Sequence, residues 1–214
     1  NPHALLLLFV LGVESFGMGI VATLSAFTMD DVVGRIDLIE ALMATWMIPQ
    51  FVLIPLWVRY SRVLGKKRLW LFGMVCTTFG FIGQFFLTEG AWILVFLCVL
   101  LIGIGTSISQ VISPSIQADI IDYDELQSGQ RKEGAYAAVW NFMRKAGTAG
   151  AAAVGGVALS LGSYDPAAEF QAESVKDEIR IAAGIIPAVV YIRGIPAFTP
   201  FSPLESEHAA AGAA

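Results

Sequence analysis

The chain has 214 residues, of which 56% are hydrophobic and 14% are charged, and its mean hydropathy is +0.69. Soluble domains average about 45–50% apolar and about 25% charged residues, so this composition is typical of a membrane protein. The formal net charge is −5 and the few basic residues lie mostly in short loops, which excludes nucleic acid as a partner. Cys76 and Cys98 lie inside apolar runs, so we expect reduced thiols and no disulfide framework.

Six apolar segments alternate with polar connections along the chain. They cover residues 4–27, 38–57, 69–87, 91–114, 134–161 and 179–201. Each is close to the ~20 residues that a helix needs to cross a ~30 Å hydrocarbon core, and none alternates as a membrane β-strand does. The sequence therefore predicts an all-α membrane protein, a bundle of six transmembrane helices over residues 1–204. Residues 205–214 are predicted to form a short cytoplasmic tail.

The basic residues predict how this bundle is oriented. Seven lysines and arginines lie in the connections after the second and fourth segments, against three in the connections at the other end. Because cytoplasmic loops carry the excess of Lys and Arg, both basic loops and both termini are predicted to be cytoplasmic. The expected location is the inner or plasma membrane. Pro196, Pro200 and Pro203 predict that the sixth helix kinks or ends near Arg193.

The first and fourth segments contain polar groups that lipid cannot satisfy. Glu14 lies about 15 Å into the first helix at 1.5 Å per residue, where a carboxylate is paired, neutral or functional. A helix–helix hydrogen bond is the structural alternative to a role in transport. Gln110 and Ser113 close a run of small and hydroxyl residues in the fourth segment, so this face is expected to meet another helix or line a polar cavity.

The fifth segment carries two basic residues at membrane depth. Asn141 and Thr148 share a face with Lys145, which predicts an inward polar seam. Lys145 is interpreted either as a substrate-path or coupling residue or as part of a structural ion pair. Arg144 is assigned to the neighbouring face, where aromatic rings can shield it. A row of small residues predicts the close approach of a neighbouring helix, and its members are Gly147, Ala151 and Gly155.

A dense group of charges lies between the fourth and fifth segments. Asp119 and Asp122 are three residues apart and share a face if the fourth helix continues, while Arg131 and Glu133 mark the start of the fifth. Ion pairs between these helix ends predict a cytoplasmic gate that forms in one state and breaks in the other. A solvated loop is the alternative, because an exposed ion pair is worth only ~0–1 kcal/mol.

The same region resembles the signature of a known family. The matching positions are Asp119, Asp122, Tyr123, Gly129, Arg131, Glu133, Gly134, Phe142, Lys145 and Gly147, with the basic run 57–68 and the tail 202–208. They are similar to the eleventh-helix region of the glycoside–pentoside–hexuronide:cation symporters, the melibiose-carrier family of the major facilitator superfamily. The resemblance implies the C-terminal six-helix half of that fold, with a substrate site near the membrane midplane between two halves. It adds Tyr123 to the expected gate.

The resemblance also implies a function, namely symport of a sugar or glycoside with Na⁺ or H⁺ by alternating access. Lys145 falls where the family has a lysine linked to the sugar and cation sites. The family's cation-binding carboxylates lie mainly in an N-terminal half that this sequence does not contain, so we expect this polypeptide alone not to transport.

Two alternatives to a sugar symporter remain open. A lysolipid-type symporter relative is one, and a lateral apolar opening would favour it over a polar pocket. A non-transporting membrane subunit or fragment is another. An intramembrane enzyme is not expected, because the only histidines, His3 and His208, lie at opposite ends and no G-x-S-x-G motif is present. Apart from a coupling cation, no cofactor is expected.

Overall fold

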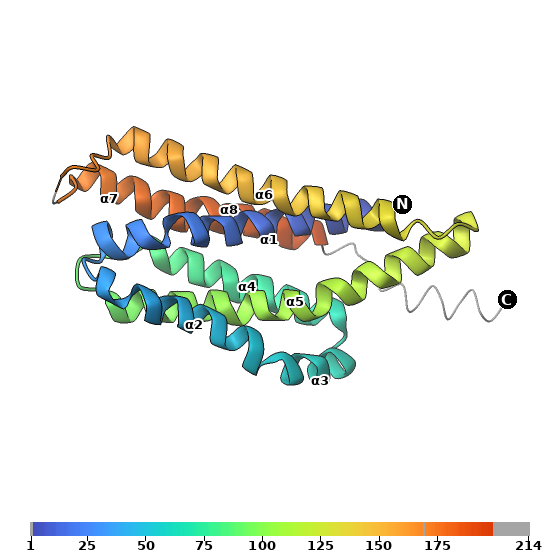
Figure 1. Ribbon diagram of the computed structural model, residues 1–214. Coiled ribbons are helices and arrows are strands. Elements are labelled where there is room, and N and C mark those ends of the chain that lie inside the picture. The colour runs from blue at the N-terminus through green and yellow to red at the C-terminus, as the bar shows by residue number, and fades with distance from the viewer. Residues whose placement is uncertain (1, 169, 199–214) are drawn as a thin grey trace.

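The computed structural model describes residues 2–168 and 170–198. Its helices are α1 (Pro2–Phe27), α2 (Ile39–Val52), α3 (Ile54–Leu64), α4 (Lys66–Phe85), α5 (Trp92–Ser128), α6 (Glu133–Gly162), α7 (Glu173–Arg180) and α8 (Ile186–Phe198). Short turns of other helix types are η1 (Thr28–Val32), η2 (Ile36–Leu38) and η3 (Ile181–Ile185). The long helices run side by side along the molecule (Figure 1). The predicted tail 205–214 and residues 199–201 of the sixth predicted span lie outside the described residues.

Several of these helices have the length and composition of membrane spans. Three stretches of the described chain are long and apolar enough to cross a membrane, namely Ala4–Val32, Trp92–Ser128 and Glu173–Pro196. Helices α2 and α3 pass the same test as a pair, although they meet at a bend of 52°. The all-α membrane fold class is thus confirmed, whereas the crossing of all six predicted segments stays a prediction.

The second span, predicted as one helix over 38–57, is broken into two helices in the structure. Pro55 has no backbone N–H and its ring clashes with the carbonyl of Phe51, so α2 ends at Val52 and α3 starts in a new direction. Residues 58–64, where the sequence predicts a loop, continue α3. The turn into α4 is made by Gly65, whose φ of +82° favours glycine.

The fourth span is longer than the sequence predicts, and the sixth continues past the point where its prolines were expected to disturb it. Helix α5 passes through Pro114 and runs to Ser128, because Ile116 and Ile120 continue its buried face beyond the predicted end at 114. Helix α8 runs to Phe198, so it does not end near Arg193, and the kink predicted there as the alternative stays a prediction. Pro196 lies in the last described turn, where it removes only one helical hydrogen bond.

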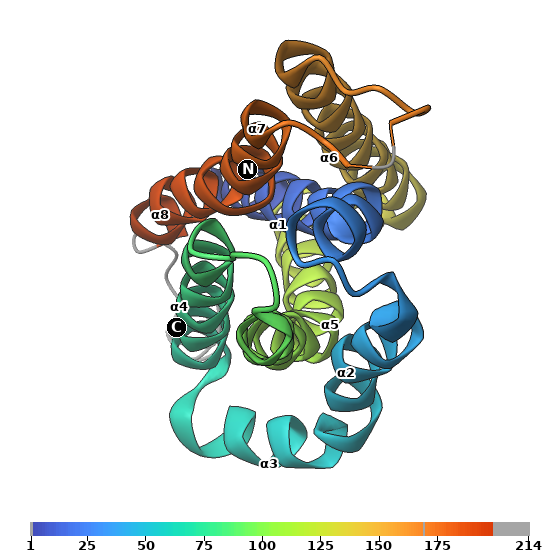
Figure 2. The same cartoon turned by 90° about the vertical axis from the view of Figure 1, so that its left-hand side faces the viewer.

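The helices pack in two groups. Helix α1 lies along α6 and α8, α5 lies along α4 and α2, and α4 also contacts α8. Figure 2 shows this arrangement along the bundle axis.

Helices α6 and α1 approach each other closely along their small residues. A Cβ on Gly147 would lie 2.8 Å from the carbonyl oxygen of Gly12, and one on Gly19 would lie 2.6 Å from the Cβ of Ala151. The predicted close approach along the small-residue row is therefore confirmed, with α1 as the neighbour.

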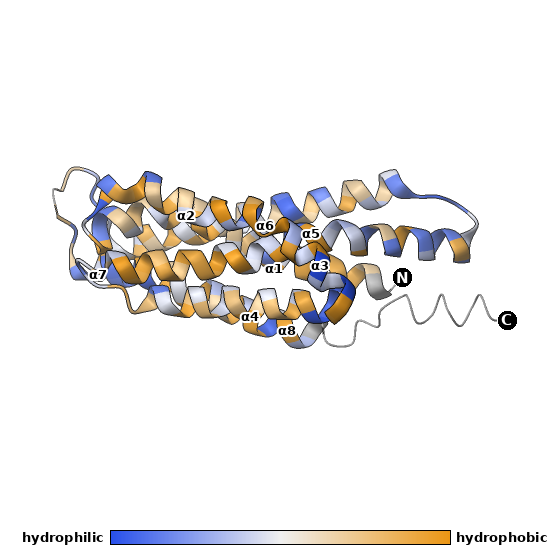
Figure 3. Ribbon diagram, turned by 90° about the horizontal axis from the view of Figure 1, so that it is seen from below, coloured by the Kyte–Doolittle hydropathy of each residue, from blue (hydrophilic) through white to orange (hydrophobic). Residues whose placement is uncertain are grey.

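The two ends of the bundle carry different connections. The α3–α4 and α5–α6 connections lie toward the right of Figure 1 with the N-terminus, and we call this the near end. The α1–α2, α4–α5 and α6–α7 connections lie on the left, at the far end. Apolar residues dominate the helices, while hydrophilic residues concentrate at the ends and on the projecting α5–α6 hairpin (Figure 3). Both predicted basic loops therefore share one end, and which side of the membrane it faces stays a prediction.

Candidate functional site

A cavity of about 420 Å³ lies where α1, α5 and α6 meet, and we call it the polar cavity. Two of its lining residues are charged, Glu14 and Arg144. Hydroxyl and amide side chains provide most of the remaining lining, namely Ser15, Thr106, Ser109, Gln110, Ser113 and Thr148. Most of this polarity comes from α5, whose polar face was predicted to meet another helix or line a cavity. A cavity that water can enter would satisfy polar groups that lipid would leave unpaired.

Glu14 connects three helices on one side of the polar cavity. Its Oε1 accepts a hydrogen bond of 2.5 Å from the indole Nε1 of Trp70 on α4, and another from the Ser109 hydroxyl on α5. Within the described residues its Oε2 takes no hydrogen bond, so this oxygen remains available to a ligand. The interhelical hydrogen bond anticipated for Glu14 is therefore present. Trp70 was not singled out from the sequence, although a buried indole N–H usually has an acceptor.

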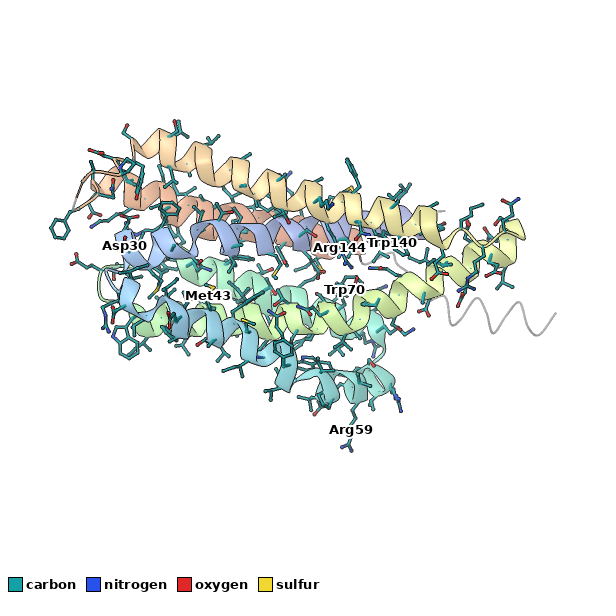
Figure 4. The ribbon with its side chains drawn as sticks, in the orientation of Figure 1. Asp30, Met43, Arg59, Trp70, Trp140 and Arg144 are labelled. Atoms are coloured by element: carbon teal, nitrogen blue, oxygen red, sulfur yellow. The ribbon has the colours of Figure 1, made fainter. Side chains whose placement is uncertain are left out.

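Arg144 is the basic residue of the polar cavity, and here the structure differs from the sequence-based placement. Arg144 and Thr148, one helical turn apart on α6, both line the cavity. Figure 4 shows Arg144 and Trp70 in the same part of the bundle. Lys145 is exposed on the adjacent face of α6 and is not among the cavity-lining residues.

The two charged residues of the polar cavity line the same space but form no ion pair with each other. In the part of the chain described by the structure, no ion pair joins Arg144 to a carboxylate, and Glu14 is held instead by neutral donors. An unpaired guanidinium presents up to five N–H donors in a planar arrangement. The space between the two side chains can therefore receive a polar group that bonds to both.

A second cavity, of about 270 Å³, lies between α5 and α6 on the near-end side, and we call it the near-end cavity. It shares Pro114 and Arg144 with the polar cavity, so Arg144 lies at the junction of the two. Asn141 and Glu133 are also in its lining. The indole nitrogen of Trp140, a further lining residue, is buried without a hydrogen-bond partner among the described residues. The two cavities are therefore adjacent, with the second lying toward the near end.

The residues predicted to form a gate make two separate sets of contacts. Arg131 forms ion pairs of 2.9 Å with Glu125, 3.2 Å with Glu133 and 3.6 Å with Asp122. The hydrogen bonds that Arg131 donates to Glu133 and Glu125 raise the pKa of its guanidinium. All four side chains are largely exposed and belong to the hairpin that joins α5 to α6. These contacts stabilise the hairpin locally.

Asp119 pairs in a different direction. Its Oδ2 lies 2.6 Å from Nζ of Lys66, the first residue of α4, so this ion pair ties α5 to the start of α4. Both side chains are about one-third exposed or less. The hydroxyl of Tyr123 accepts a 2.7 Å hydrogen bond from Gln127 on the same helix. A gating role for these residues stays a prediction.

The outer face of α5 is held to α2 and α3 by side-chain hydrogen bonds. Nε2 of Gln110 donates to Oε1 of Gln50 on α2. The indole Nε1 of Trp57 on α3 donates to the Ser107 hydroxyl at 2.7 Å. Gln110 thus contacts the polar cavity and also bridges two helices, so both alternatives for this polar face are present in the structure.

Comparison with known proteins agrees with the fold. The family model described as MFS/sugar transport protein matches residues 1–203. An uncharacterized symporter of Synechocystis sp. is 25% identical over 150 residues, which are 67% of this chain and 27% of that protein. The uncharacterized symporter YjmB of Bacillus subtilis is 30% identical over 114 residues, 53% of this chain and 25% of the relative. A glucuronide carrier protein homolog of Escherichia coli is 26% identical over 124 residues, 58% and 27% of the two chains.

The extent of these matches defines what they show. The matched regions span only about a quarter of the length of the curated relatives, 25 to 27%. The family model, in contrast, covers nearly the whole chain, and its family consists of transport proteins rather than enzymes. The resemblance inferred from the charged motif is thereby confirmed at the level of the family. The chain belongs to the MFS/sugar transport protein family.

Proposed function

We propose that this chain supplies one half of the pathway of a symporter that moves a sugar or glycoside together with Na⁺ or H⁺ by alternating access. The observation that carries the proposal is the polar cavity, with Glu14 and Arg144 facing the same space. Two relatives of this chain are named as symporters and a third as a glucuronide carrier protein homolog, which supports the proposal. In this proposal the near end faces the cytoplasm of a cell whose inner or plasma membrane holds the protein.

The hydrogen-bonding character of the polar cavity supports a sugar-like solute. The hydroxyls of Ser15, Thr106 and Thr148 donate to carbonyl oxygens of their own helices at 2.6, 2.9 and 3.1 Å. Their lone pairs remain free to accept hydrogen bonds, while Arg144 supplies donors. Sugar hydroxyls both donate and accept, so they match this mixed lining. A lysolipid tail, which is the alternative, would instead require an apolar wall.

Lys145 fits the same proposal through a different contact. Its side chain is exposed next to Arg144 and, within the described residues, it has no ion pair. A lysine at membrane depth is costly unless it is paired or hydrated. We therefore assign it a partner carboxylate on a second six-helix half, which would also hold the coupling cation. Asn141, Thr148, Gln110 and Glu14 complete the proposed path in this half.

Matched substitutions of three basic residues in the full-length protein test the proposal. Arg144→Gln should lower the uptake of a labelled glycoside into vesicles about tenfold or more, because a charge-assisted hydrogen bond to the solute is lost. Lys145→Ala should abolish accumulation while the protein remains inserted. Arg59→Gln is the control, since Arg59 lies on α3 away from both cavities (Figure 4). Normal accumulation by both the Arg144 and Lys145 variants would refute the proposal.

Glu14→Gln separates coupling from solute binding. Glutamine has nearly the same shape and can still accept hydrogen bonds from Trp70 and Ser109, but it cannot carry charge. If Glu14 takes part in coupling, this variant should exchange labelled for unlabelled solute across the membrane yet fail to accumulate it against a gradient. Equal loss of exchange and accumulation would assign Glu14 to solute binding instead.

A further inference from the structure

An apolar groove of about 260 Å³ runs between α6 and the continuous rod formed by α7, η3 and α8. From α6 it is lined by Val154, Val157 and Leu161, and from the facing rod by Ile181 and Ile186. At 3.6 residues per turn, these α6 positions lie about half a turn from Asn141 and Thr148. The groove shares no lining residue with the polar cavity or the near-end cavity. It is therefore a separate, lateral feature of the outer surface of the bundle.

One carboxylate lines this groove, that of Glu178. Helix α7 carries five charged residues, and four of them pair with one another. Lys176 lies 2.9 Å from Glu173, and Arg180 lies 2.6 Å from Asp177. Glu178 is left over, half-buried, and among the described residues it has neither an ion pair nor a hydrogen bond. The residual negative charge of α7 is thus located at the far-end rim of an apolar groove.

The shape and the charge of the groove indicate the same ligand. Its lining on the rod extends from residue 178 to residue 186, about 12 Å at 1.5 Å per residue, parallel to the helix axes and so to lipid acyl chains. A partly buried carboxylate is unfavourable unless a cation pairs with it. The other four charges of α7 pair with one another, so the charge left at the groove is negative and an anionic head group would be repelled.

We infer that this groove binds one acyl chain of a phosphatidylethanolamine molecule, whose ammonium group pairs with Glu178. The lipid is a bound structural ligand, because the groove does not communicate with the proposed solute path. The inference does not depend on which solute the protein carries. Its failure would therefore leave the proposed function untouched, and the reverse also holds.

Lipid binding by the full-length protein tests the charge. The protein is reconstituted in nanodiscs of equal phosphatidylethanolamine and phosphatidylglycerol, extracted in mild detergent, and its retained lipid is quantified by mass spectrometry. Phosphatidylethanolamine should be enriched, and Glu178→Gln should lower the enrichment about tenfold through loss of the charge-assisted hydrogen bond. Glu40→Gln removes an exposed charge from α2 at the same end and should leave the enrichment unchanged. Enrichment that survives in Glu178→Gln, or preferential retention of phosphatidylglycerol, would overturn the inference.

Replacing each of two neighbouring alanines by phenylalanine tests the groove itself. Ala153 lines the groove, whereas its neighbour Ala152 is exposed on α6 outside the lining. Ala153→Phe should fill the groove and reduce retained phosphatidylethanolamine, while Ala152→Phe, which adds the same bulk, should not. A dimer that Ala153→Phe dissociates, with no lipid enriched in the unmodified protein, would show that a second copy of the chain covers the groove and would refute lipid binding. The Glu178→Gln result remains decisive if Ala153→Phe does not fold.

Discussion

The far and near ends of the bundle are held together by different interactions. At the far end a buried apolar cluster joins η1, α2, α5, α7 and the α4–α5 connection, and its members are Met29, Val32, Val33, Leu42, Leu87, Val95, Val99, Val175 and Ile179. Backbone and side-chain hydrogen bonds reinforce it, from Gly90 N to the Val33 carbonyl at 3.0 Å and from Arg180 Nε to the Leu87 carbonyl at 2.7 Å. At the near end, in contrast, α5 and α6 project as a hairpin stabilised by exposed ion pairs (Figure 1).

This difference indicates which end opens more readily. Separating buried apolar surfaces exposes them to water and costs free energy in proportion to the area. Breaking an exposed ion pair costs little, because water solvates both charges. The near-end cavity already extends the polar cavity in that direction through Arg144. We therefore expect the near end to be the more easily opened side, and three stability measurements test this difference between the two ends.

The largest effect is expected from filling the close contact between η3 and α4 on the far-end side. A Cβ on Gly184 would lie 2.7 Å from the backbone nitrogen of Phe85 and 3.1 Å from the carbonyl oxygen of Phe81. Gly184→Leu should lower the free energy of unfolding in detergent micelles, measured by SDS titration, by about 3 kcal/mol. Gly156→Leu is the control, because a Cβ there meets nothing within 4 Å. Equal destabilisation by the two variants would contradict a tightly packed contact between η3 and α4 at the far end.

An intermediate effect is expected for Arg180→Met. This change removes the hydrogen bond to the Leu87 carbonyl, and it leaves that buried acceptor unpaired. The free energy of unfolding should fall by about 2 kcal/mol. Arg35→Met at the same end removes an exposed pair with Asp37 and should give no measurable change in the same titration. If Arg35→Met lowers the free energy of unfolding more than Arg180→Met does, the buried hydrogen bond from Arg180 is not what stabilises the far end.

The smallest effect is expected for the near-end ion pair between Lys66 and Asp119. A double-mutant cycle with Lys66→Met and Asp119→Asn isolates the pair from the other contacts of each residue. The coupling energy should be about 0.5–1 kcal/mol and should shrink as salt is added. A coupling that stays constant with salt and exceeds the Arg180 effect would make the near end the more firmly held one.

The sequence predicted where the helices lie better than it predicted which side of each helix contacts which neighbour. The small-residue row on α6 and the polar face of α5 follow from helical spacing, and both make the expected contacts. The break at Pro55 follows from a local rule for proline that the prediction of one continuous span over 38–57 did not apply. The helical conformation of residues 58–64 and the bond from Trp70 to Glu14, in contrast, depend on tertiary contacts between distant segments. Such contacts leave no local pattern, so the sequence did not predict them.

Arg144 and Lys145 show where the sequence was ambiguous and how it could have been resolved. At 3.6 residues per turn, Asn141 and Thr148 lie between the two, so a shared face with these residues cannot separate Arg144 from Lys145. The small-residue row can, because Gly147 and Ala151 follow Arg144 by three and seven residues and therefore share its face. That row packs on α1, which carries Glu14. Combining the two patterns would have directed Arg144, rather than Lys145, into the polar cavity.

The hydrogen bond between Trp70 and Glu14 has a spectroscopic consequence. The fluorescence of an indole depends on its hydrogen-bond acceptor and on nearby charge, and Trp70 is fully buried with a carboxylate as its acceptor. The chain has five tryptophans, so replacing the other four with phenylalanine would leave a single emitter in contact with the wall of the polar cavity. The emission of that indole would report charge and occupancy at Glu14 in real time, without any added label.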